Sequence, residues 1–337
     1  MDCSARVRLW DEALAGVRAC LREQGLREVS TSIRRDAVAI EPWIEPIGAG
    51  QGRWLATSPE LAMKRLLCRG SGSIFQLAHV FRAAERGPRH REEFHLLEWY
   101  RTPGELPDVM ADVERVVART FAVARDLIGS ELAPAPRRWV CVEMIDLLRE
   151  TTGFPLIGDE PAAEIEPLLA RARARAGVRW AQVDVDRSAQ LDSHADSLAD
   201  LLAWTELFSL WSDLELDPWL ARQDPQLGIH VVGFPRMLAA LAQVEGARAQ
   251  RFESHVGGVE LANGYLELRD PIEQRRRFEL VAALREHHGL PELPLPERFL
   301  ADLADAGLPA CAGVALGFDR LLAIATGSES LDVLALD

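Results

Sequence analysis

Apolar and polar residues recur along this chain at two spacings, and each spacing predicts a different element. From about residue 4 to residue 24 the apolar side chains follow helical spacing, which predicts an amphipathic helix ended by Gly25. Its predicted apolar face consists of Val7, Leu14, Val17 and Leu21. The stretches SIFQLAHVFRAAE and EEFHLLEWYR predict two strands around the basic loop RGPRHR, and therefore an antiparallel pair.

Several further elements are predicted from their start signals. Ser58-Pro59-Glu60 offers a serine N-cap, a proline at the first helical position and an acid in the first turn, so we expect a helix from there to about Gly70. A helix is expected over 107–128, and Asp270-Pro271 predicts another capped helix start. After a boundary or linker at 133–138, residues 139–250 are expected to be mostly helical, with IHVVGF as a buried strand.

The helix after Ser58 carries Lys64, the single lysine of a chain with 38 Lys and Arg residues. We interpret Lys64 mainly as a solvated residue of this helix. The alternative interpretation is that the segment belongs to a site where the type of side chain matters.

Composition narrows the class of protein. The chain is 48% hydrophobic and 27% charged, as ordinary globular proteins are, and it contains no apolar run of the roughly 18 residues that span a membrane. The N-terminus lacks the apolar core of a secretory signal. The five scattered cysteines form no CxxC pair, which argues for reduced thiols and against zinc or disulfides. We therefore expect a cytoplasmic protein, whose net charge of −14 opposes broad nucleic-acid binding.

Candidate chemistry begins on the strand EEFHLLEWYR. Alternation places Phe94, Leu96, Glu98 and Tyr100 on one face. A carboxylate on such an apolar face is costly unless it is paired. Glu98 therefore either pairs with an internal arginine or awaits the cation of a ligand.

Three other stretches carry charge or glycine. Arg82 and the loop 86–91 present guanidinium groups that suit phosphate oxygens, although charged hairpin loops are often merely solvated. Asn263-Gly264 predicts a turn between Glu260 and Glu267, two acids of the kind Mg²⁺ accepts beside substrate phosphates, or else two ordinary strand-end glutamates. In GVALGFDR the small residues 313, 315 and 317 allow either a close ligand or close core packing, before a helix opens at Asp319-Arg320.

Taken in order, these stretches resemble one family. FRAAE with EFHLLEWYR resembles motif 2 of the class II aminoacyl-tRNA synthetases, and GVALGFDR resembles motif 3. Together with TSPELAMKRLL and GVELANGYLEL they are similar to the lysyl-tRNA synthetase paralogues that attach lysine or (R)-β-lysine to elongation factor P. The similarity covers about 25–128 and 228–335 and is thin over 134–227. It implies an α+β fold, in which an antiparallel sheet is flanked by helices.

The resemblance implies an ATP-dependent, AMP-forming amino-acid ligase. Arg82, Arg320 and Glu260 are the implied catalytic residues, and Glu260 and Glu267 are the expected Mg²⁺ ligands. The residues expected to contact ATP are Arg82, Glu85, Arg91, Phe94, Glu260, Leu261, Gly317 and Arg320. The residues expected to line the amino-acid pocket are Ser58, Pro59, Glu60, Glu98, Tyr100, Asn263 and Glu267. A pocket rich in acids suits lysine, which carries two ammonium groups.

The same resemblance sets expectations for domains and partners. We expect one catalytic domain over 1–337, with a mostly helical insertion at about 134–227 and no anticodon-binding OB domain. The expected acceptor is a lysine side chain of elongation factor P rather than tRNA, reached through the basic runs near 86–91, 171–179 or 275–277. A homodimer is expected, as in the family, and no association with a membrane.

Three positions depart from the family pattern. Ala84 replaces the acid that contacts the adenine amino group, and Glu85 is expected to point to the opposite face unless the loop is bulged. Arg91 replaces an asparagine that contacts ATP, and Ser32 stands in place of the proline of the dimer interface. The loss of one hydrogen bond to adenine would cost about 1–3 kcal/mol.

Two alternative functions share the same residues. One is a free-standing amino-acid ligase that acts on a carrier protein or a small amine. The other is a non-catalytic synthetase paralogue that binds an amino acid or a nucleotide, an interpretation that Ala84, Arg91 and Ser32 favour.

Overall fold

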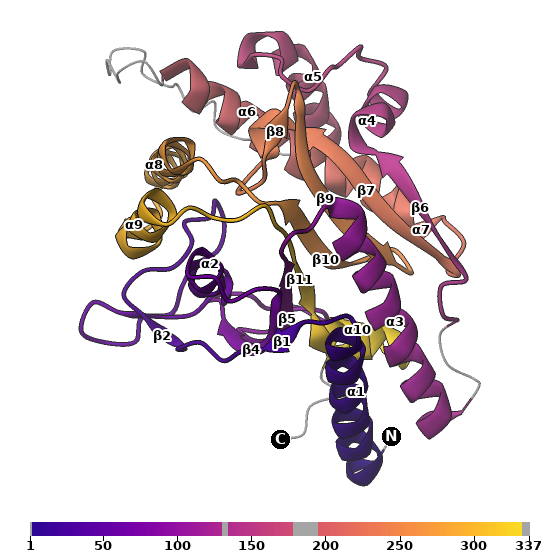
Figure 1. The fold of residues 1–337 in the computed structure, drawn as a ribbon. Helices are drawn as coiled ribbons and strands as arrows, with labels where there is room; N and C mark the ends of the chain where they lie inside the picture. The colour runs from indigo at the N-terminus through magenta and orange to yellow at the C-terminus, as the bar shows by residue number, and fades with distance from the viewer. Residues whose placement is uncertain (1, 130–133, 178–194, 332–337) are drawn as a thin grey trace.

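The molecule is built on one large sheet. The computed structural model describes residues 2–129, 134–177 and 195–331, in which nine strands form this sheet in the order β1-β4-β5-β11-β10-β9-β7-β6, with β8 beside β9 (Figure 1). Neighbouring strands are antiparallel except for the outer pairs β1–β4 and β6–β7, which are parallel. The predicted α+β class is confirmed, and the two parallel pairs were not foreseen.

The strands of this sheet have the following bounds: β1 Arg27–Glu28, β4 Ile74–Phe81, β5 Glu93–Arg101, β6 Arg138–Glu143, β7 Leu227–Pro235, β8 Val244–Glu245, β9 Arg248–Val256, β10 Val259–Leu266 and β11 Ala312–Gly317. A separate small sheet pairs β2 Arg34–Arg35 with β3 Trp54–Leu55. The expected hairpin is present as β4 and β5, and IHVVGF lies in β7 as predicted.

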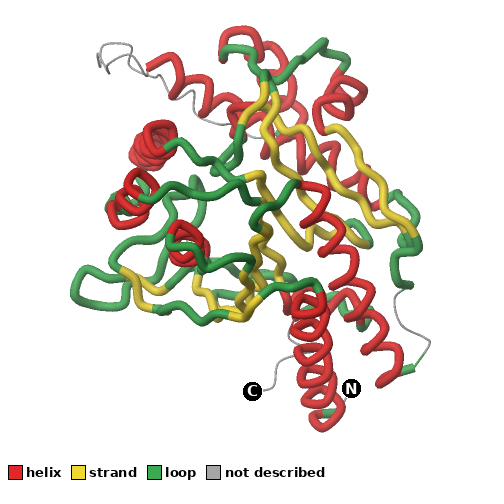
Figure 2. Tube along the Cα trace, viewed as in Figure 1, coloured by secondary structure: helices red, strands yellow, loops and turns green. Residues whose placement is uncertain are grey.

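Helices cover both faces of the sheet (Figure 2). One face carries α1 Cys3–Glu23, α3 Leu106–Ile128 and α10 Phe318–Ala325, which share a hydrophobic core with β5, β10 and β11. The other face carries α2 Glu60–Cys68, α8 Pro271–His287 and α9 Glu297–Asp305, which pack in a second cluster with Tyr100. The functional residues derived above lie mainly on this second face.

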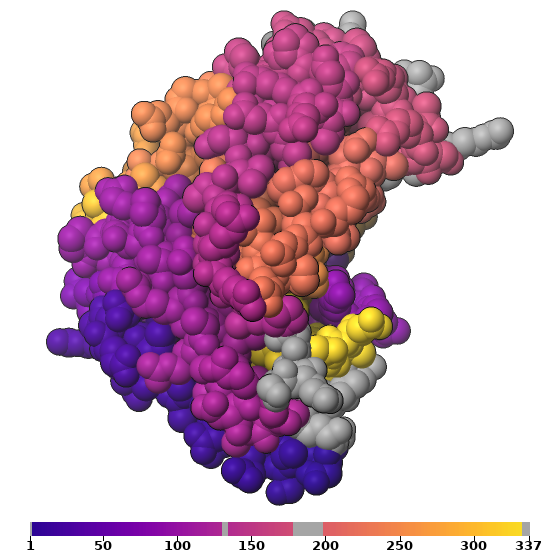
Figure 3. Space-filling view, turned by 90° about the vertical axis from the view of Figure 1, so that its right-hand side faces the viewer, coloured from indigo at the N-terminus to yellow at the C-terminus, as the bar shows by residue number. Residues whose placement is uncertain are grey.

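The central part of the chain forms one end of the molecule, and α1 lies at the opposite end (Figure 3). The central part has a hydrophobic cluster of its own. It contains α4 Met144–Thr152, α5 Ala162–Ala176, α6 Ala195–Trp211, a π-helical turn over Ser212–Leu216 and α7 Asp217–Ala221. A 3₁₀ turn, Arg236–Leu238, follows β7. Residue 133 of the expected linker and residues 178–179 of the basic run lie outside the described residues.

The expected N-terminal helix is present, but one residue of its expected apolar face is exposed. Val7 is 48% exposed, whereas the buried series is Leu9, Ala13 and Val17, which recurs every four residues along α1. Because residues four apart lie on one side of a helix, this series sets the side that packs against α3, and Val7 falls outside it. Gly25 follows the helix with φ +83°, as a terminating glycine does.

The first residues of two other helices were predicted to within one position. Helix α8 begins at Pro271, and Asp270 caps it by accepting from the backbone N–H groups of Ile272 and Glu273. Helix α2 begins one residue later than expected, at Glu60, so Pro59 occupies the cap position. Ser58 still accepts a hydrogen bond from the Glu60 N–H at 3.0 Å, so its hydroxyl fixes this helix start.

The turn predicted at Asn263-Gly264 is wrong. Strand β10 runs through both residues, and the reversal from β9 occurs at Gly257 and Gly258, both with positive φ. Gly264 serves packing instead, because a Cβ atom there would lie 2.3 Å from the Phe252 ring. Among the described residues, no helix is both long and apolar enough to cross a membrane.

Candidate active site

A cavity of about 210 Å³ opens on the helix α2 side of the sheet. Its walls come from the β4–β5 loop, β5, β10, β11 and the start of α10. All the residues expected to contact ATP line it, namely Arg82, Glu85, Arg91, Phe94, Glu260, Leu261, Gly317 and Arg320. Residues from three distant parts of the chain therefore meet around one space.

Arg82 and Phe94 form one wall of the cavity. The hairpin register pairs Val80 with Phe94, so the chain leaves β4 at Arg82 directly beside the Phe94 ring. The Arg82 Cζ lies 5.0 Å from the ring centroid, and its Nε donates to the Thr57 carbonyl at 3.3 Å. The guanidinium is thus held over an aromatic face, a position that also suits an anionic ligand.

The loop after Arg82 reverses its direction locally at Ala84. Ala84 has φ +61°, in the left-handed region, and its N–H donates to Glu92 Oε1 at 2.9 Å. This local reversal places Glu85 on the cavity wall, 3.5 Å from Arg82 Nη1. The condition stated for Glu85, a bulged loop, is therefore met.

Arg320 lies on the wall formed by α10. Its Nη1 donates to the Glu260 carbonyl at 2.7 Å, and its Nη2 lies 3.2 Å from His90 Nε2. Burial and the Arg320 charge lower the pKa of His90, which keeps the imidazole neutral and able to accept this hydrogen bond. These two contacts fix the guanidinium between β10 and the β4–β5 loop.

A loop held by a buried arginine closes another side of the cavity. Arg285 of α8 is 1% exposed and donates to the carbonyls of Glu41 and Ile44 and to the Glu45 carboxylate. Glu41 and Ile44 line the cavity. Burial raises the pKa of Glu41 to about 7. Sequence reasoning missed this loop, because its position depends on a helix about 240 residues away.

Glu98 and Tyr100 lie farther along the same face of β5 as Phe94. Glu98 accepts from Ser58 Oγ at 2.7 Å and from the Tyr100 hydroxyl at 2.6 Å. Burial raises the pKa of Glu98 to about 8. Burial and the Glu98 charge raise the pKa of Tyr100, so the phenol remains a donor. The interpretation that Glu98 pairs with an internal arginine is wrong, because among the described residues two hydroxyl groups and no arginine hold this carboxylate. The alternative interpretation, that Glu98 awaits the cation of a ligand, stays a prediction.

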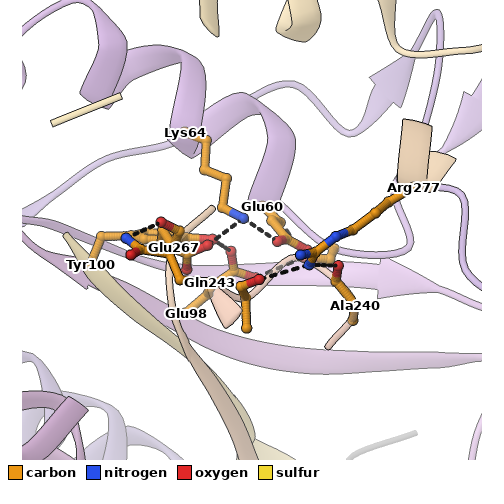
Figure 4. Close-up of polar contacts among 10 residues, drawn as sticks. Glu60, Lys64, Glu98, Tyr100, Ala240, Gln243, Glu267 and Arg277 are labelled. Atoms are coloured by element: carbon orange, nitrogen blue, oxygen red, sulfur yellow. Dashed lines mark hydrogen bonds and ion pairs between the residues drawn. The ribbon is translucent and has the colours of Figure 1, made fainter. Parts of the chain in front are cut away.

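The interpretation of Lys64 as a solvated residue is wrong. Its side chain is 1% exposed, and Nζ lies 2.6 Å from Glu60 Oε1 and 2.6 Å from Glu267 Oε2 (Figure 4). Lys64 lies on the buried side of α2 with Met63 and Leu67, which directs it at the end of β10. A signal was present in the sequence, since Glu60 and Lys64 are four residues apart on one helix.

The residues expected to line the amino-acid pocket separate into two groups. Glu60 and Glu267 contact the Lys64 ammonium, Ser58 and Tyr100 donate to Glu98, and Pro59 precedes Glu60 at the start of α2. We call these six residues together with Lys64 the carboxylate slot. Asn263 lies on the cavity wall instead, where it accepts a hydrogen bond from Arg251 Nε at 3.3 Å.

Gly313 makes room for the carboxylate slot. A Cβ atom at this position would lie 2.3 Å from the Tyr100 ring and 2.5 Å from Glu267 Oε1. Of the two interpretations of the small residues in motif 3, close packing therefore holds at Gly313. Ala315 and Gly317 line the cavity.

The expected pairing of Glu260 with Glu267 around one Mg²⁺ does not fit this fold. Because extended chain joins them, their Cα atoms lie roughly 20 Å apart. Glu253 is the better partner, since the β9–β10 hairpin brings it near Glu260. Burial raises the pKa of Glu253 to about 7; Arg251 opposes this rise and Glu260 adds to it.

A metal would depend on few protein ligands here. In the part of the chain that the structure describes, no group of three or more His, Cys, Asp or Glu side chains could hold a metal ion. Two carboxylates such as Glu253 and Glu260 suit Mg²⁺, which takes its other ligands from water and phosphates. Sequence reasoning missed Glu253, because strand β9 carries several polar residues and nothing in its sequence singles out this acid.

Comparison with known proteins places this site in a family. The model of the tRNA synthetases class II (D, K and N) matches residues 2–336. A protein named elongation factor P–(R)-beta-lysine ligase from Histophilus somni (strain 2336) is 34% identical over 330 residues, which cover 94% of this chain and 90% of that protein. Proteins of the same name from Salmonella gallinarum, 35% identical over 336 residues (96% and 91%), and from Pasteurella multocida (strain Pm70), 34% identical over 330 residues (94% and 90%), are also similar.

Proposed function

The chain belongs to the family of class II tRNA synthetases (D, K and N), and we propose that it activates lysine or (R)-β-lysine with ATP and transfers it to a lysine side chain of elongation factor P. The observation that carries this proposal is the arrangement along β5. A cavity walled by Arg82, Phe94 and Arg320 adjoins a buried carboxylate slot on the same face of that strand.

The first step needs orientation and charge neutralisation more than proton transfer. The carboxylate of the amino acid attacks the α-phosphorus of ATP and displaces pyrophosphate, which forms the aminoacyl-adenylate. Because that carboxylate is already the nucleophile, the protein has to hold the reactants in line and neutralise charge on the phosphate. Arg82 and Arg320 are positioned on the cavity wall for this task, and Phe94 offers a face for adenine.

Mg²⁺ would supply further positive charge to the phosphates when bound. We propose Glu260 and Glu253 as its protein ligands, in place of the pair Glu260 and Glu267. In the second step, the amine of the acceptor lysine attacks the acyl carbon, loses a proton and displaces AMP.

The acceptor is proposed to approach at the β4–β5 loop. Arg89, His90 and Arg91 line the cavity mouth, and the Arg86 side chain is 82% exposed. Arg86 pairs with Glu92 and is still more exposed than the paired arginines described in the other two basic runs. Those side chains are between 14% and 56% exposed, namely Arg173, Arg175, Arg275, Arg276 and Arg277. An acidic protein surface therefore suits this loop better than it suits the other runs.

We also propose that 134–227 is an insertion within a single catalytic domain, that the protein forms a homodimer in the cytoplasm, and that tRNA is not its acceptor. Light scattering of the purified protein measures the oligomeric state, and a mass equal to one chain would contradict the dimer.

The proposed activity is tested by lysine- and β-lysine-dependent ATP–pyrophosphate exchange, followed by a mass measurement on elongation factor P. We expect Arg82→Ala and Arg320→Ala to reduce exchange by about 10²-fold or more, since each removes a charge that stabilises the transition state. Arg275→Ala, which removes a surface arginine of α8, is the control and should keep wild-type exchange. Exchange with no lysine-type amino acid, in the wild-type protein, would refute the proposal.

A further inference from the structure

Lys64 is the feature of the carboxylate slot that the proposed reaction does not use. Its ammonium bridges Glu60 of the same helix and Glu267 at the end of β10, at 2.6 Å from each carboxylate (Figure 4). The Lys64 and Glu267 side chains are each 1% exposed and that of Glu60 is 14% exposed. Removal of an ammonium ion from water is costly, so this cation stays where two carboxylates compensate it.

Glu98 is held in a different way. Both of its hydrogen bonds come from neutral hydroxyl groups, those of Ser58 and Tyr100. Hydroxyl donors orient a carboxylate but leave its charge uncompensated. Of the three acids in the slot, Glu98 therefore has the strongest electrostatic demand for an additional cation.

From this difference we propose that Lys64 is a positioning residue and a resident counter-cation: it ties Glu60 to Glu267 and leaves Glu98 to receive an ammonium group of the amino acid. This inference rests on the proposed function and deepens it. It assigns the specificity of the slot to the number of ammonium groups it can accept. With Lys64 in place the slot has a formal charge of −2, which comes from three carboxylates and one ammonium.

Two structural features hold Lys64 in this role. Helix α2 begins beside Ser58, which contacts both the Glu60 N–H and Glu98, so one helix start fixes both anions. On the other side, the backbone carbonyl of Glu267 accepts from Gln243 Nε2 at 3.0 Å, and its N–H donates to the Cys311 carbonyl at 3.0 Å. The bridge therefore joins two elements that are each anchored independently.

The first test uses the fact that Lys64 is the only lysine in the sequence. Protein labelled with ¹⁵N-lysine gives a single side-chain ammonium signal. We expect this signal to exchange slowly with water, both alone and with saturating unlabelled lysine and a non-hydrolysable ATP analogue. Fast exchange in the free protein, or a change to fast exchange when lysine binds, would overturn the inference, because the cation would then be exposed or displaced.

The second test is chemical rescue. Lys64→Ala should raise the KM for lysine in ATP–pyrophosphate exchange at least about tenfold, with the KM for ATP within about twofold. Added propylammonium should restore the KM for lysine, whereas uncharged 1-propanol should not. Leu67→Ala, which truncates a buried apolar neighbour on α2, is the control and should show no response to propylammonium.

The outcomes separate this inference from the function on which it rests. An unchanged KM for lysine in a folded Lys64→Ala protein, or a higher KM that propylammonium does not lower, overturns the inference alone. If Lys64→Ala does not fold, the exchange rate of the Lys64 ammonium signal in the wild-type protein still tests the inference. Absence of exchange in the wild-type protein overturns the proposed function instead.

Discussion

Replacement of Glu98 by glutamine leaves the size of the side chain nearly unchanged. It removes the carboxylate to which Ser58 and Tyr100 donate hydrogen bonds. In the wild-type protein, burial raises the pKa of Glu98 to about 8. An ammonium ligand binds the ionised form, so binding of lysine should release a proton below this pH. The affinity for lysine should therefore rise with pH, and Glu98→Gln should abolish that rise.

The magnitude follows from the pKa. At pH 6 only about one Glu98 in a hundred is ionised, and at pH 8 about half are, so the apparent affinity for lysine should increase by about 50-fold over this range. Glu98→Gln should bind lysine with flat pH dependence and, at pH 8, about 2–5 kcal/mol more weakly, since one buried charged partner is lost.

The protein without ligand should show the opposite trend. Because the folded pKa lies above the unfolded value of 4.5, protonated Glu98 stabilises the unliganded fold at low pH. That stability should be lost as the pH rises from about 4.5 through 8, and Glu98→Gln should remove this loss.

Isothermal titration calorimetry with lysine at pH 6, 7 and 8, in buffers of different ionisation enthalpy, measures both the affinity and the protons released. Glu114→Gln is the control, because burial also raises the pKa of Glu114 but this residue lies on α3, across the sheet. Equal wild-type affinities at pH 6 and pH 8, or the same slope in Glu98→Gln, would refute the reasoning.

Other predictions follow from the cavity. Glu253→Gln should raise the Mg²⁺ concentration for half-maximal exchange several-fold, whereas Glu267→Gln should leave it unchanged; equal effects in the two variants would contradict the assignment. Ala84→Gly should stabilise the protein by up to about 1 kcal/mol, because it relieves a left-handed backbone at a residue with a side chain. A thermal melt measures this, and a lower midpoint for Ala84→Gly would argue against that conformation.

Local patterns predicted the elements that carry motifs 2 and 3. The hairpin of β4 and β5 and the junction of β11 with α10 have short, mostly apolar strands next to clear turn or helix starts. The order of these stretches, with Arg82 and Arg320 in them, was sufficient to suggest the family. Because each of these signals is contained within about 20 residues, no knowledge of packing was needed.

The turn at Asn263-Gly264 and the exposure of Lys64 were predicted wrongly for a common reason. Each depends on what packs against the residue, and sequence spacing carries no such information. Gly264 is a strand residue because Phe252 fills the place of its side chain, and Lys64 is buried because Glu267 arrives from β10. The same holds for Glu253, which meets Glu260 only through the β9–β10 hairpin.

The sequence by itself thus determined the elements around motifs 2 and 3 and their order, because propensity, periodicity and capping act between near neighbours. The resemblance of these motifs to a family then implied the fold class and the roles of Arg82 and Arg320. Only the tertiary structure decided which acids are compensated, namely Glu60 and Glu267 by Lys64, and which is left to hydroxyl groups, namely Glu98. The charge state of a buried group depends on every dipole and ion around it, and the fold assembles these from segments distant in the chain.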